Sequence, residues 1–140
     1  MALYRLIYSS RALSSITYPD LKQIWASSEK NNPAVGLTGM LCFGNGLFLQ
    51  VLEGDRGAVN HTYHRIVKDE RHYNPEIIEY CRVDHRHFGI WSMKSVQLNS
   101  NLTAAECQVL LKHHTVPVFE PEKMDAAQCL GVMLDLAAIA

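Results

Sequence analysis

The residue of this sequence with the clearest chemical demand is Gln50, which lies in the otherwise apolar run "LFLQVLE" (47–53). Its primary amide has two hydrogen-bond donors and an acceptor with two lone pairs. Burying such a group without partners costs roughly 1–3 kcal/mol, so a glutamine in a core strand must find partners. Tyr8 adds a phenolic hydroxyl to a second apolar run, "LYRLIYSS" (3–10). Together these two side chains could bind the polar edge of a small molecule.

The elements that carry these residues are predicted to be strands. The turn "GNG" (44–46) between two apolar runs is typical of a β-hairpin over 36–53. Strand side chains alternate between faces, so Gln50 shares its face with Phe48. On the first strand Tyr8 is expected on the same side of the sheet as Gln50.

The predicted elements of residues 1–97 follow the order βαββαββ. Strands are expected at 3–10, in both arms of the 36–53 hairpin, at 76–86 and at 90–96, and helices at 17–32 and 56–73. This order contains the split βαβ arrangement of a ferredoxin-like α+β sheet with two helices on one face. In that topology the first and third strands are central neighbours, so Tyr8 and Gln50 can meet on the helix-covered face.

Helix boundaries are predicted from capping residues and prolines. Thr17, followed by Asp20 three positions later, predicts the start of the first helix. The sequence "NNP" (31–33) is expected to end it, because the residue before proline avoids the α region. Asn74-Pro75 is expected to end the second helix in the same way.

Residues 98–140 are predicted to form a C-terminal helical appendage to the 1–97 domain. Thr103 and Glu106 have the spacing of a capping box, and 122–140 is mostly apolar. An open antiparallel sheet needs a cover on its second face. We expect the appendage to cover that face or to join subunits.

Composition limits the possible functions. Hydrophobic residues make up 48% of the 140 residues and charged residues 19%, which indicates a folded domain, and the formal net charge is −1. No basic cluster of the kind that binds nucleic acid is present. The sequence has no run approaching the roughly 18 apolar residues that span a bilayer, and no signal peptide is apparent. Its four widely spaced cysteines are expected to be reduced, which favours a soluble cytoplasmic protein.

Each predicted helix carries polar residues next to its apolar ones. On the first, the stripe of Leu21, Ile24 and Ser28 continues at helical spacing to two amides, Asn31 and Asn32. On the second, three polar residues at steps of four and three are expected to form a ridge beside Ile66: Arg65, Asp69 and His72. The space between the helices would thus have an apolar end and an amide-lined end, which suits a flat heterocycle such as an isoalloxazine ring. Taken singly, each of these residues also has an ordinary structural explanation.

Four segments together resemble a BLUF domain, the blue-light sensor that uses FAD. They are "YRLIYSS", "NNPAVGLTGMLCF", "GLFLQVLEG" and "FGIWSMKSV", in this order within 1–97. The helical tail makes the chain similar to short stand-alone, PixD-like members of the family. The resemblance implies that Tyr8 donates an electron and a proton to the excited flavin, and that the amide of Gln50 bridges Tyr8 and the flavin and switches its hydrogen bonds.

The resemblance also implies roles for the other site residues. Asn32, with Asn31 beside it, would pair with the polar edge of the ring. The remaining cofactor contacts would come from the first helix and the second: Ile24, Ser28, Arg65, Ile66, Asp69 and His72. Trp91 and Met93 would relay the change outward. Strand alternation places both on one face, so which of them lies next to Gln50 stays open.

The implied function is a photoreceptor rather than an enzyme, with FAD as cofactor and FMN or riboflavin as possible substitutes. A slightly red-shifted, reversible state would alter the interaction with a response-regulator-like partner, in a homo-oligomer. The alternative is a non-photoactive ferredoxin-like module that binds flavin or RNA, although the charge disfavours RNA.

Two enzymatic alternatives remain weaker. The seven histidines lack a carboxylate or cysteine at metal-ligand spacing, so no metal site is expected. His113 and His114 are expected at the exposed end of a helix. An acylphosphatase-like hydrolase would need an anion-holding loop, and "SSRALSSITYPD" (9–20) offers Arg11 and serines but no glycine-rich cradle.

Overall fold

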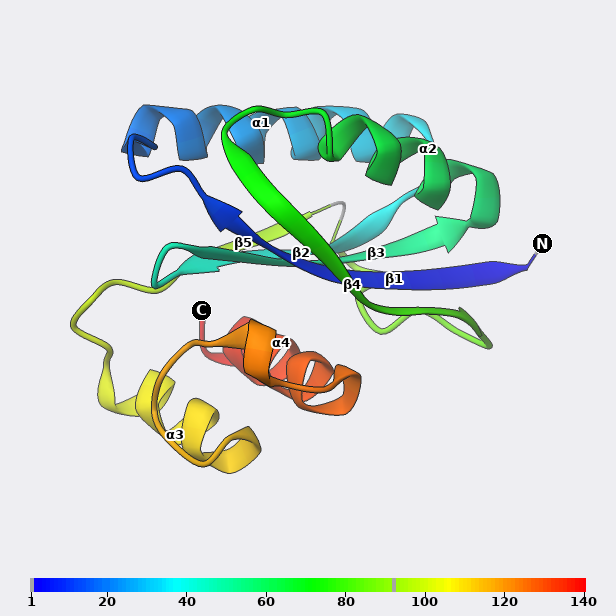
Figure 1. The fold of residues 1–140 in the computed structure, drawn as a ribbon. Coiled ribbons are helices and arrows are strands. Elements are labelled where there is room, and N and C mark those ends of the chain that lie inside the picture. Colours follow the sequence, from blue (N-terminus) through cyan, green and yellow to red (C-terminus); the bar gives the residue numbers. More distant parts are fainter. Residues whose placement is uncertain (1, 92) are drawn as a thin grey trace.

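The computed structural model describes residues 2–91 and 93–140. It is an α+β fold with a five-stranded sheet in the order β4-β1-β3-β2-β5 (Figure 1). The elements are β1 (Leu3–Ala12), α1 (Tyr18–Ala34), β2 (Thr38–Gly44), β3 (Leu47–Asp55), α2 (Arg56–Ile66), β4 (His72–Val83), β5 (Lys94–Gln97), α3 (Ala104–His113), η1 (Pro121–Lys123) and α4 (Ala126–Ile139). Helices α1 and α2 cover one face, and α3 and α4 lie on the other. The predicted ferredoxin-like order is confirmed.

The β-hairpin forms at the position that the turn at 44–46 predicts. Asn45 and Gly46 both have positive φ, 51° and 72°, as a two-residue type I′ turn requires. The strands on either side pair in register, and β1 pairs with β3 so that Tyr8 lies opposite Gln50. The expected meeting of these two residues on central strands is therefore confirmed.

Helix α1 starts as predicted and ends later than predicted. Thr17 and Asp20 form a complete capping box, but the helix continues through Pro33 to Ala34. Pro33 lies in the last turn, so it removes only one hydrogen bond of the helix. The amide N–H groups of the next residues then close the end on the Asn32 and Pro33 carbonyls. The expected stop at 31–33 was wrong for this reason.

Helix α2 ends at Ile66, well before the predicted residue 73. Asp69 stops the helix by accepting a hydrogen bond from the Arg71 backbone at 2.9 Å, which makes a tight turn. The chain then enters β4 at His72, which pairs with Ala12. Pro75 therefore lies within a strand rather than after a helix, which is tolerated because β4 is an edge strand.

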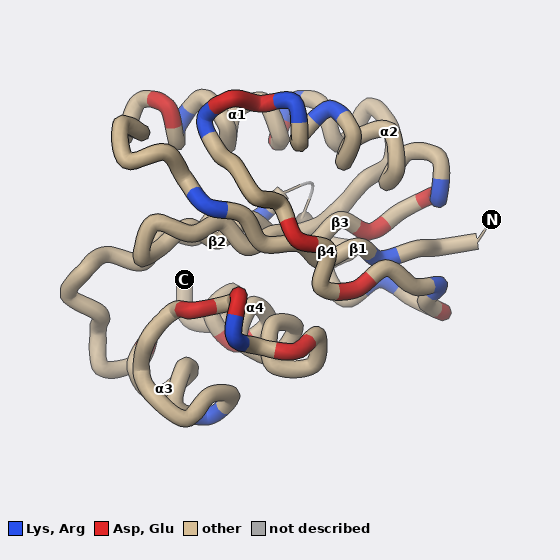
Figure 2. Tube along the Cα trace, in the orientation of Figure 1, with Lys and Arg blue, Asp and Glu red and all other residues tan. Residues whose placement is uncertain are grey.

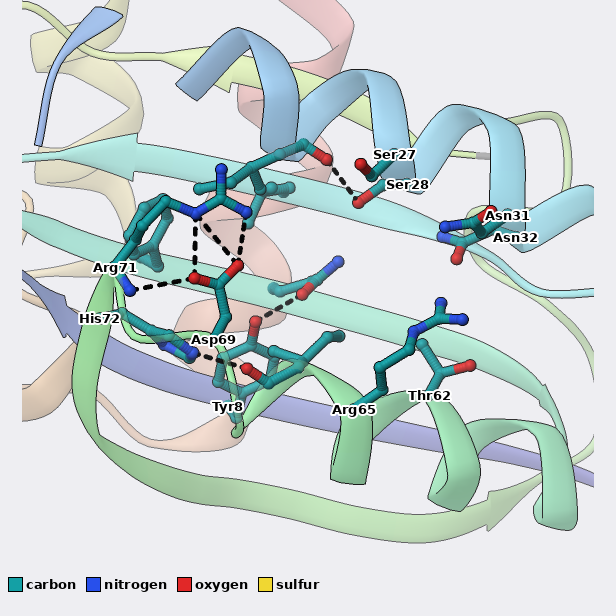
Figure 3. A pocket seen from close by; sticks show the side chains of 15 residues that line it. Tyr8, Ser27, Ser28, Asn31, Asn32, Thr62, Arg65, Asp69, Arg71 and His72 are labelled. Carbon is teal, nitrogen blue, oxygen red and sulfur yellow. Dashed lines mark hydrogen bonds and ion pairs between the residues drawn. The ribbon is translucent and has the colours of Figure 1, made fainter. Parts of the chain in front are cut away.

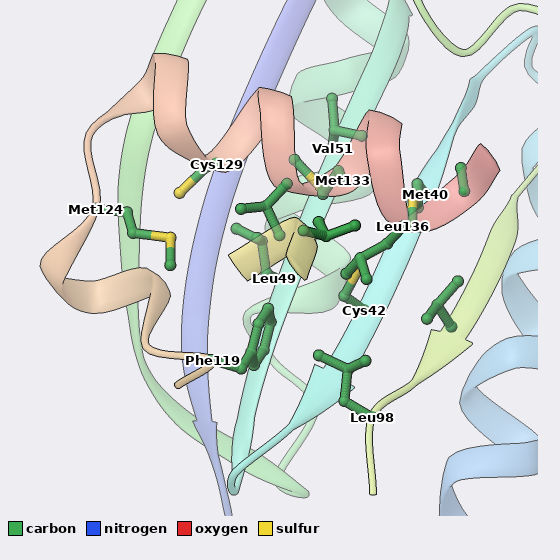
Figure 4. Packing of buried hydrophobic residues seen from close by; sticks show 14 of the residues in the cluster. Met40, Cys42, Leu49, Val51, Leu98, Phe119, Met124, Cys129, Met133 and Leu136 are labelled. Carbon is green, nitrogen blue, oxygen red and sulfur yellow. The ribbon is translucent and has the colours of Figure 1, made fainter. Parts of the chain in front are cut away.

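The C-terminal helices cover the second face of the sheet, which was one of the two roles predicted for them. Side chains of β2 and β3 interdigitate with those of α4 in one buried cluster (Figure 4). Its members from the sheet and α4 include Met40, Cys42, Leu49, Val51, Cys129, Val132, Met133 and Leu136. Helix α4 begins at Ala126, capped by Asp125 and Gln128, because 121–123 form the short helix η1.

The prediction that the two histidines at the end of α3 are exposed was wrong. His113 hydrogen-bonds to Asp135 of α4 at 2.6 Å, and His114 hydrogen-bonds to Glu120 at 2.7 Å. Their side chains are 19% and 9% exposed. The prediction failed because both partners lie on segments that return to α3 only in the folded chain.

The predictions made from composition concern cysteines, charge and membranes. All four cysteines are free, with Cys42 and Cys129 buried and Cys81 and Cys107 partly exposed. Figure 2 shows acidic and basic residues interspersed along the chain. Among the described residues, no helix is long and apolar enough to cross a bilayer.

Candidate functional site

A cavity of about 290 Å³ lies between α1 and α2, with β1 and β3 as its floor (Figure 3). Its lining residues are Tyr8, Ile24, Ser27, Ser28, Asn31, Asn32, Leu41, Phe48, Gln50, Thr62, Arg65, Ile66, Asp69, Arg71 and His72. Every residue that the sequence predicted as a cofactor contact is among them. A volume of this order accommodates a small-molecule ring system.

The floor of the cavity is a hydrogen-bonded Tyr–Gln pair. The Tyr8 hydroxyl donates to Gln50 Oε1 at 2.5 Å, and the two residues are 3% and 2% exposed. Burial, with smaller contributions from Tyr63 and Asp69, raises the pKa of Tyr8 far above its usual 10.0. Tyr8 is therefore a neutral donor. This bond turns the Gln50 carbonyl toward Tyr8 and its NH₂ group away.

The Gln50 NH₂ group points at Met93. Its Nε2 donates to Met93 Sδ at 3.6 Å, a weak hydrogen bond to sulfur. Met93 is 4% exposed and belongs to the hydrophobic cluster around Tyr8. Trp91 instead packs on the cluster that contains α4, where its ring centroid lies 6.2 Å from that of Phe88. The residue beside Gln50 is thus Met93.

The expectation that alternation places Trp91 and Met93 on one face was wrong. Strand β5 begins at Lys94, so neither residue is in the strand that 90–96 predicted, and Ser92 between them lies outside the described residues. Alternation holds only for extended chain. Here the two side chains enter different clusters on different sides of the sheet.

One end of the cavity is lined by amides. Asn31 and Asn32, in the last turns of α1, lie together, and Arg65 of α2 extends toward them from the other side (Figure 3). Asn32 is 2% exposed. Ser28, one turn earlier, donates its hydroxyl hydrogen to the Ile24 carbonyl at 3.1 Å. These side chains offer N–H and C=O groups to the edge of a ring.

The other end is closed by an ion pair and a histidine. Arg71 binds Asp69 through Nη2–Oδ2 at 2.5 Å and reaches the Asp20 carbonyl of α1 at 3.5 Å. The hydrogen bonds from Arg71, which outweigh partial burial, lower the pKa of Asp69. His72 bridges Ser10 at 2.7 Å and the Ile66 carbonyl at 2.8 Å.

The predicted polar ridge of Arg65, Asp69 and His72 on one helix does not exist, because α2 ends at Ile66. The three residues still line the cavity, from α2, the turn after it and β4. Sequence reasoning missed Arg71, since a helix through 73 turns it away from Asp69. It also omitted Ser27, Leu41, Phe48 and Thr62 as lining residues. Leu41 could have been found from the hairpin register, which pairs it with Gln50.

The donor set fits a flavin. Apolar walls from Ile24, Leu41 and Ile66 suit the body of a flat heterocycle. The amides at one end suit an edge of alternating N–H and C=O groups. Between them, the Gln50 amide is buried, and among the described residues its NH₂ group donates to the weak sulfur acceptor of Met93.

A ferredoxin-like sheet with a ring-sized cavity under two helices and a buried Tyr–Gln floor is the arrangement of a module that binds a small flat molecule. Residues 3–94 match the family model described as "BLUF: Sensors of blue-light using FAD". The chain belongs to this family, and its cofactor is FAD.

Relatives and solved structures agree with the family. The chain is 34% identical over 87 residues to photoactivated adenylate cyclase subunit alpha of Euglena gracilis, a match over 62% of this chain and 8% of that protein. It spans only this small part of the cyclase. Among solved structures, BlsA in its photo-activated state is 28% identical, with a TM-score of 0.83 over 96% of this chain and 94% of that chain. BlrB in its dark state is 25% identical, with a TM-score of 0.78 over 99% and 98%.

Proposed function

We propose that this chain is a photoreceptor whose switch is the hydrogen-bonded series Tyr8–Gln50–Met93. The observation that supports it is the orientation of the Gln50 amide. Its oxygen accepts from Tyr8 at 2.5 Å and its nitrogen donates to Met93 at 3.6 Å. Rotation or tautomerisation of the amide would exchange a donor for an acceptor without moving the backbone.

When bound, FAD supplies the absorption of blue light and an excited state that accepts an electron. Tyr8 gives up an electron and its hydroxyl proton, which moves along the short bond to the Gln50 amide. The electron would return to Tyr8, and Tyr8 would regain a proton from Gln50 Nε2 once the side chain had rotated, so that Tyr8 ends unchanged. Gln50 would be left as its imidic-acid tautomer, whose changed hydrogen bonds to the bound flavin would shift the flavin absorption slightly to the red. That state relaxes in darkness, and no substrate is converted.

The other cavity residues hold the cofactor in this proposal. Asn31 and Asn32 pair with the polar edge of the ring, and Ile24, Ser28 and Ile66 contact its body. Arg65, Asp69 and His72 lie near the ring and the ribityl-phosphate chain. Residues 1–97 then form the light-sensing domain and 98–140 an appendage.

The output is proposed to reach a response-regulator-like protein, with this chain in a homo-oligomer. The packing supports an output through the face of the sheet that α3 and α4 cover. The residues before Met93 include Phe88 and Trp91, and both contact the cluster that contains α4. A change at Met93 can therefore reach the C-terminal helices through a short segment of chain.

An absorption spectrum of the FAD-loaded protein, in darkness and after blue light, tests the proposal. We expect a small red shift that reverses in darkness. Tyr8→Phe and Gln50→Ala should keep FAD bound and abolish the shift. Tyr63→Phe is a matched control, because it removes the same hydroxyl group from a ring whose centroid lies 5.3 Å from that of Tyr8. A normal shift in Tyr8→Phe would refute the mechanism, and no shift in the wild type would refute photoreception.

A further inference from the structure

The connection between β4 and β5 joins opposite edges of the sheet. With the strand order β4-β1-β3-β2-β5, it must pass β1, β3 and β2. We call residues 84–93 the crossover. It ends at Met93, the residue that contacts the Gln50 amide. Whatever fixes the crossover therefore also fixes one partner of Gln50.

Glu53 fixes the middle of the crossover. It lies on β3 with 0% exposure, and as a residue three positions after Gln50 it points to the opposite face. Its Oε1 accepts from the Phe88 backbone at 2.8 Å and its Oε2 from the His87 backbone at 3.0 Å. A buried carboxylate that accepts two backbone N–H groups makes strong, directional bonds. The proposed photocycle leaves this buried charge without a role.

Arg86 fixes the start of the crossover. Its Nη1 donates to Thr38 Oγ1 at 2.8 Å and to the Glu53 carbonyl at 2.9 Å, and its Nη2 donates to the Gly36 carbonyl at 2.9 Å. Glu53 belongs to β3, Thr38 is the first residue of β2, and Gly36 lies in the turn before β2. A single guanidinium therefore joins the crossover to both strands of the hairpin that contains Gln50.

A third charged group lies beside Glu53. Arg5, its register partner on β1, contacts His87 Nδ1 at 3.2 Å and pairs with Glu79 at 2.8 Å. His87 Nδ1 lies 3.8 Å from Glu53 Oε2. The hydrogen bonds to the carboxylate thus come from the crossover backbone at His87 and Phe88, and Arg5 contacts the ring of His87 beside it.

Beyond Phe88, two backbone hydrogen bonds hold Trp91. The Trp91 amide donates to the Phe88 carbonyl at 3.2 Å, and the Trp91 carbonyl accepts from Gly39 at 3.2 Å. Met93 then packs on Gly39, where an added Cβ would lie 3.3 Å from Met93 Cε. Met93 thus lies two positions after Trp91, whose backbone is bound both to the crossover and to β2.

We propose that Glu53 and Arg86 are positioning residues that hold the Met93 sulfur against the Gln50 amide and thereby set the thermal recovery rate of the light-induced state. The proposal rests on the proposed function, because it assigns these residues to the same switch. Neither residue lines the FAD cavity, so they act through Met93 and not on the cofactor directly.

The first test is Glu53→Gln in the FAD-loaded full chain. Glutamine keeps the size but places an NH₂ group against one backbone N–H. Asp84→Asn makes the same chemical change at an exposed position of the crossover and is the matched control. We expect Glu53→Gln to change the dark-recovery rate by about fivefold, and by less than about 1.5-fold in a Met93→Leu background, as for residues coupled in one network. An equal effect in both backgrounds would overturn the proposal.

A second test needs no light. In protein labelled at the methionine methyl carbon, Glu53→Gln and Arg86→Gln should shift the Met93 methyl resonance in darkness. Asp84→Asn and Arg82→Gln, at exposed positions, should leave it unchanged. Met93→Leu assigns the resonance. If one of these two variants does not fold, the other still tests the proposal. If the wild type shows no red shift, the proposed function fails while this resonance still decides the positioning role. An unmoved resonance in both variants would overturn the positioning role even beside a normal photocycle.

Discussion

Replacing Tyr8 by phenylalanine removes one hydroxyl group from the centre of the site. That hydroxyl donates to Gln50 Oε1 at 2.5 Å, and Gln50 is only 2% exposed, so removal of the donor leaves a buried acceptor without this partner. A buried polar atom that loses its partner costs about 1–3 kcal/mol. We expect Tyr8→Phe to lower the free energy of unfolding by this amount, which corresponds to a fall in Tm of roughly 3–10 °C for a chain of this length.

A double-mutant cycle tests whether this loss comes from the Tyr8–Gln50 bond. Gln50→Leu leaves the Tyr8 hydroxyl without its acceptor, so a similar loss is expected. The double variant has neither orphaned group, and its loss should fall short of the sum by about 0.5–3 kcal/mol. The assay is urea unfolding at several FAD concentrations, which allows the stabilisation by bound cofactor to be subtracted. Losses that simply add would refute the reasoning.

Three further predictions concern the frame around the site. Leu136→Ala, on α4 at 1% exposure, should cost about 2–5 kcal/mol in urea unfolding, and a negligible cost would mean that α4 does not pack on the sheet. The hydrogen bond from His113 lowers the pKa of Asp135 below its usual 3.8, so this contact stabilises fully above that pH and is lost as the pH falls through the lowered value. Asp135→Asn should therefore reduce the acid dependence of Tm, and an unchanged pH profile would contradict the contact. Gly39→Ala should abolish soluble expression because the new Cβ collides with the Val51 carbonyl, and a normal yield with normal Tm would disprove that close approach.

The parts of the fold that the sequence predicts correctly depend on local signals. The turn at 44–46 requires positive φ at adjacent positions, and Asn45-Gly46 supplies both. Thr17 and Thr103 begin their helices with capping boxes that need only residues three positions away. The topology then places Tyr8 opposite Gln50. The floor of the cavity thus follows from short-range patterns combined with one fold rule.

The errors occur where distant residues decide the local structure. Asn74-Pro75 is a helix terminator by local rules, but pairing of His72 with β1 converts the segment into an edge strand. Arg71 was missed because its partner Asp69 is reached only through the turn that ends α2. The orientation of Trp91 could not be predicted from strand alternation, since Trp91 lies before the start of β5 at Lys94.

The route from Gln50 to the C-terminal helices can also be argued from the packing. β3 pairs along its length with both β1 and β2, so a rearranged Gln50 side chain is not expected to displace its backbone. The crossover is held at fewer points, and its Trp91 contacts the cluster that contains α4. We therefore expect light to accelerate amide hydrogen exchange at Trp91 and in β5 while exchange in β3 is unchanged. Faster exchange in β3, with the crossover unaffected, would place the route through the central strand instead.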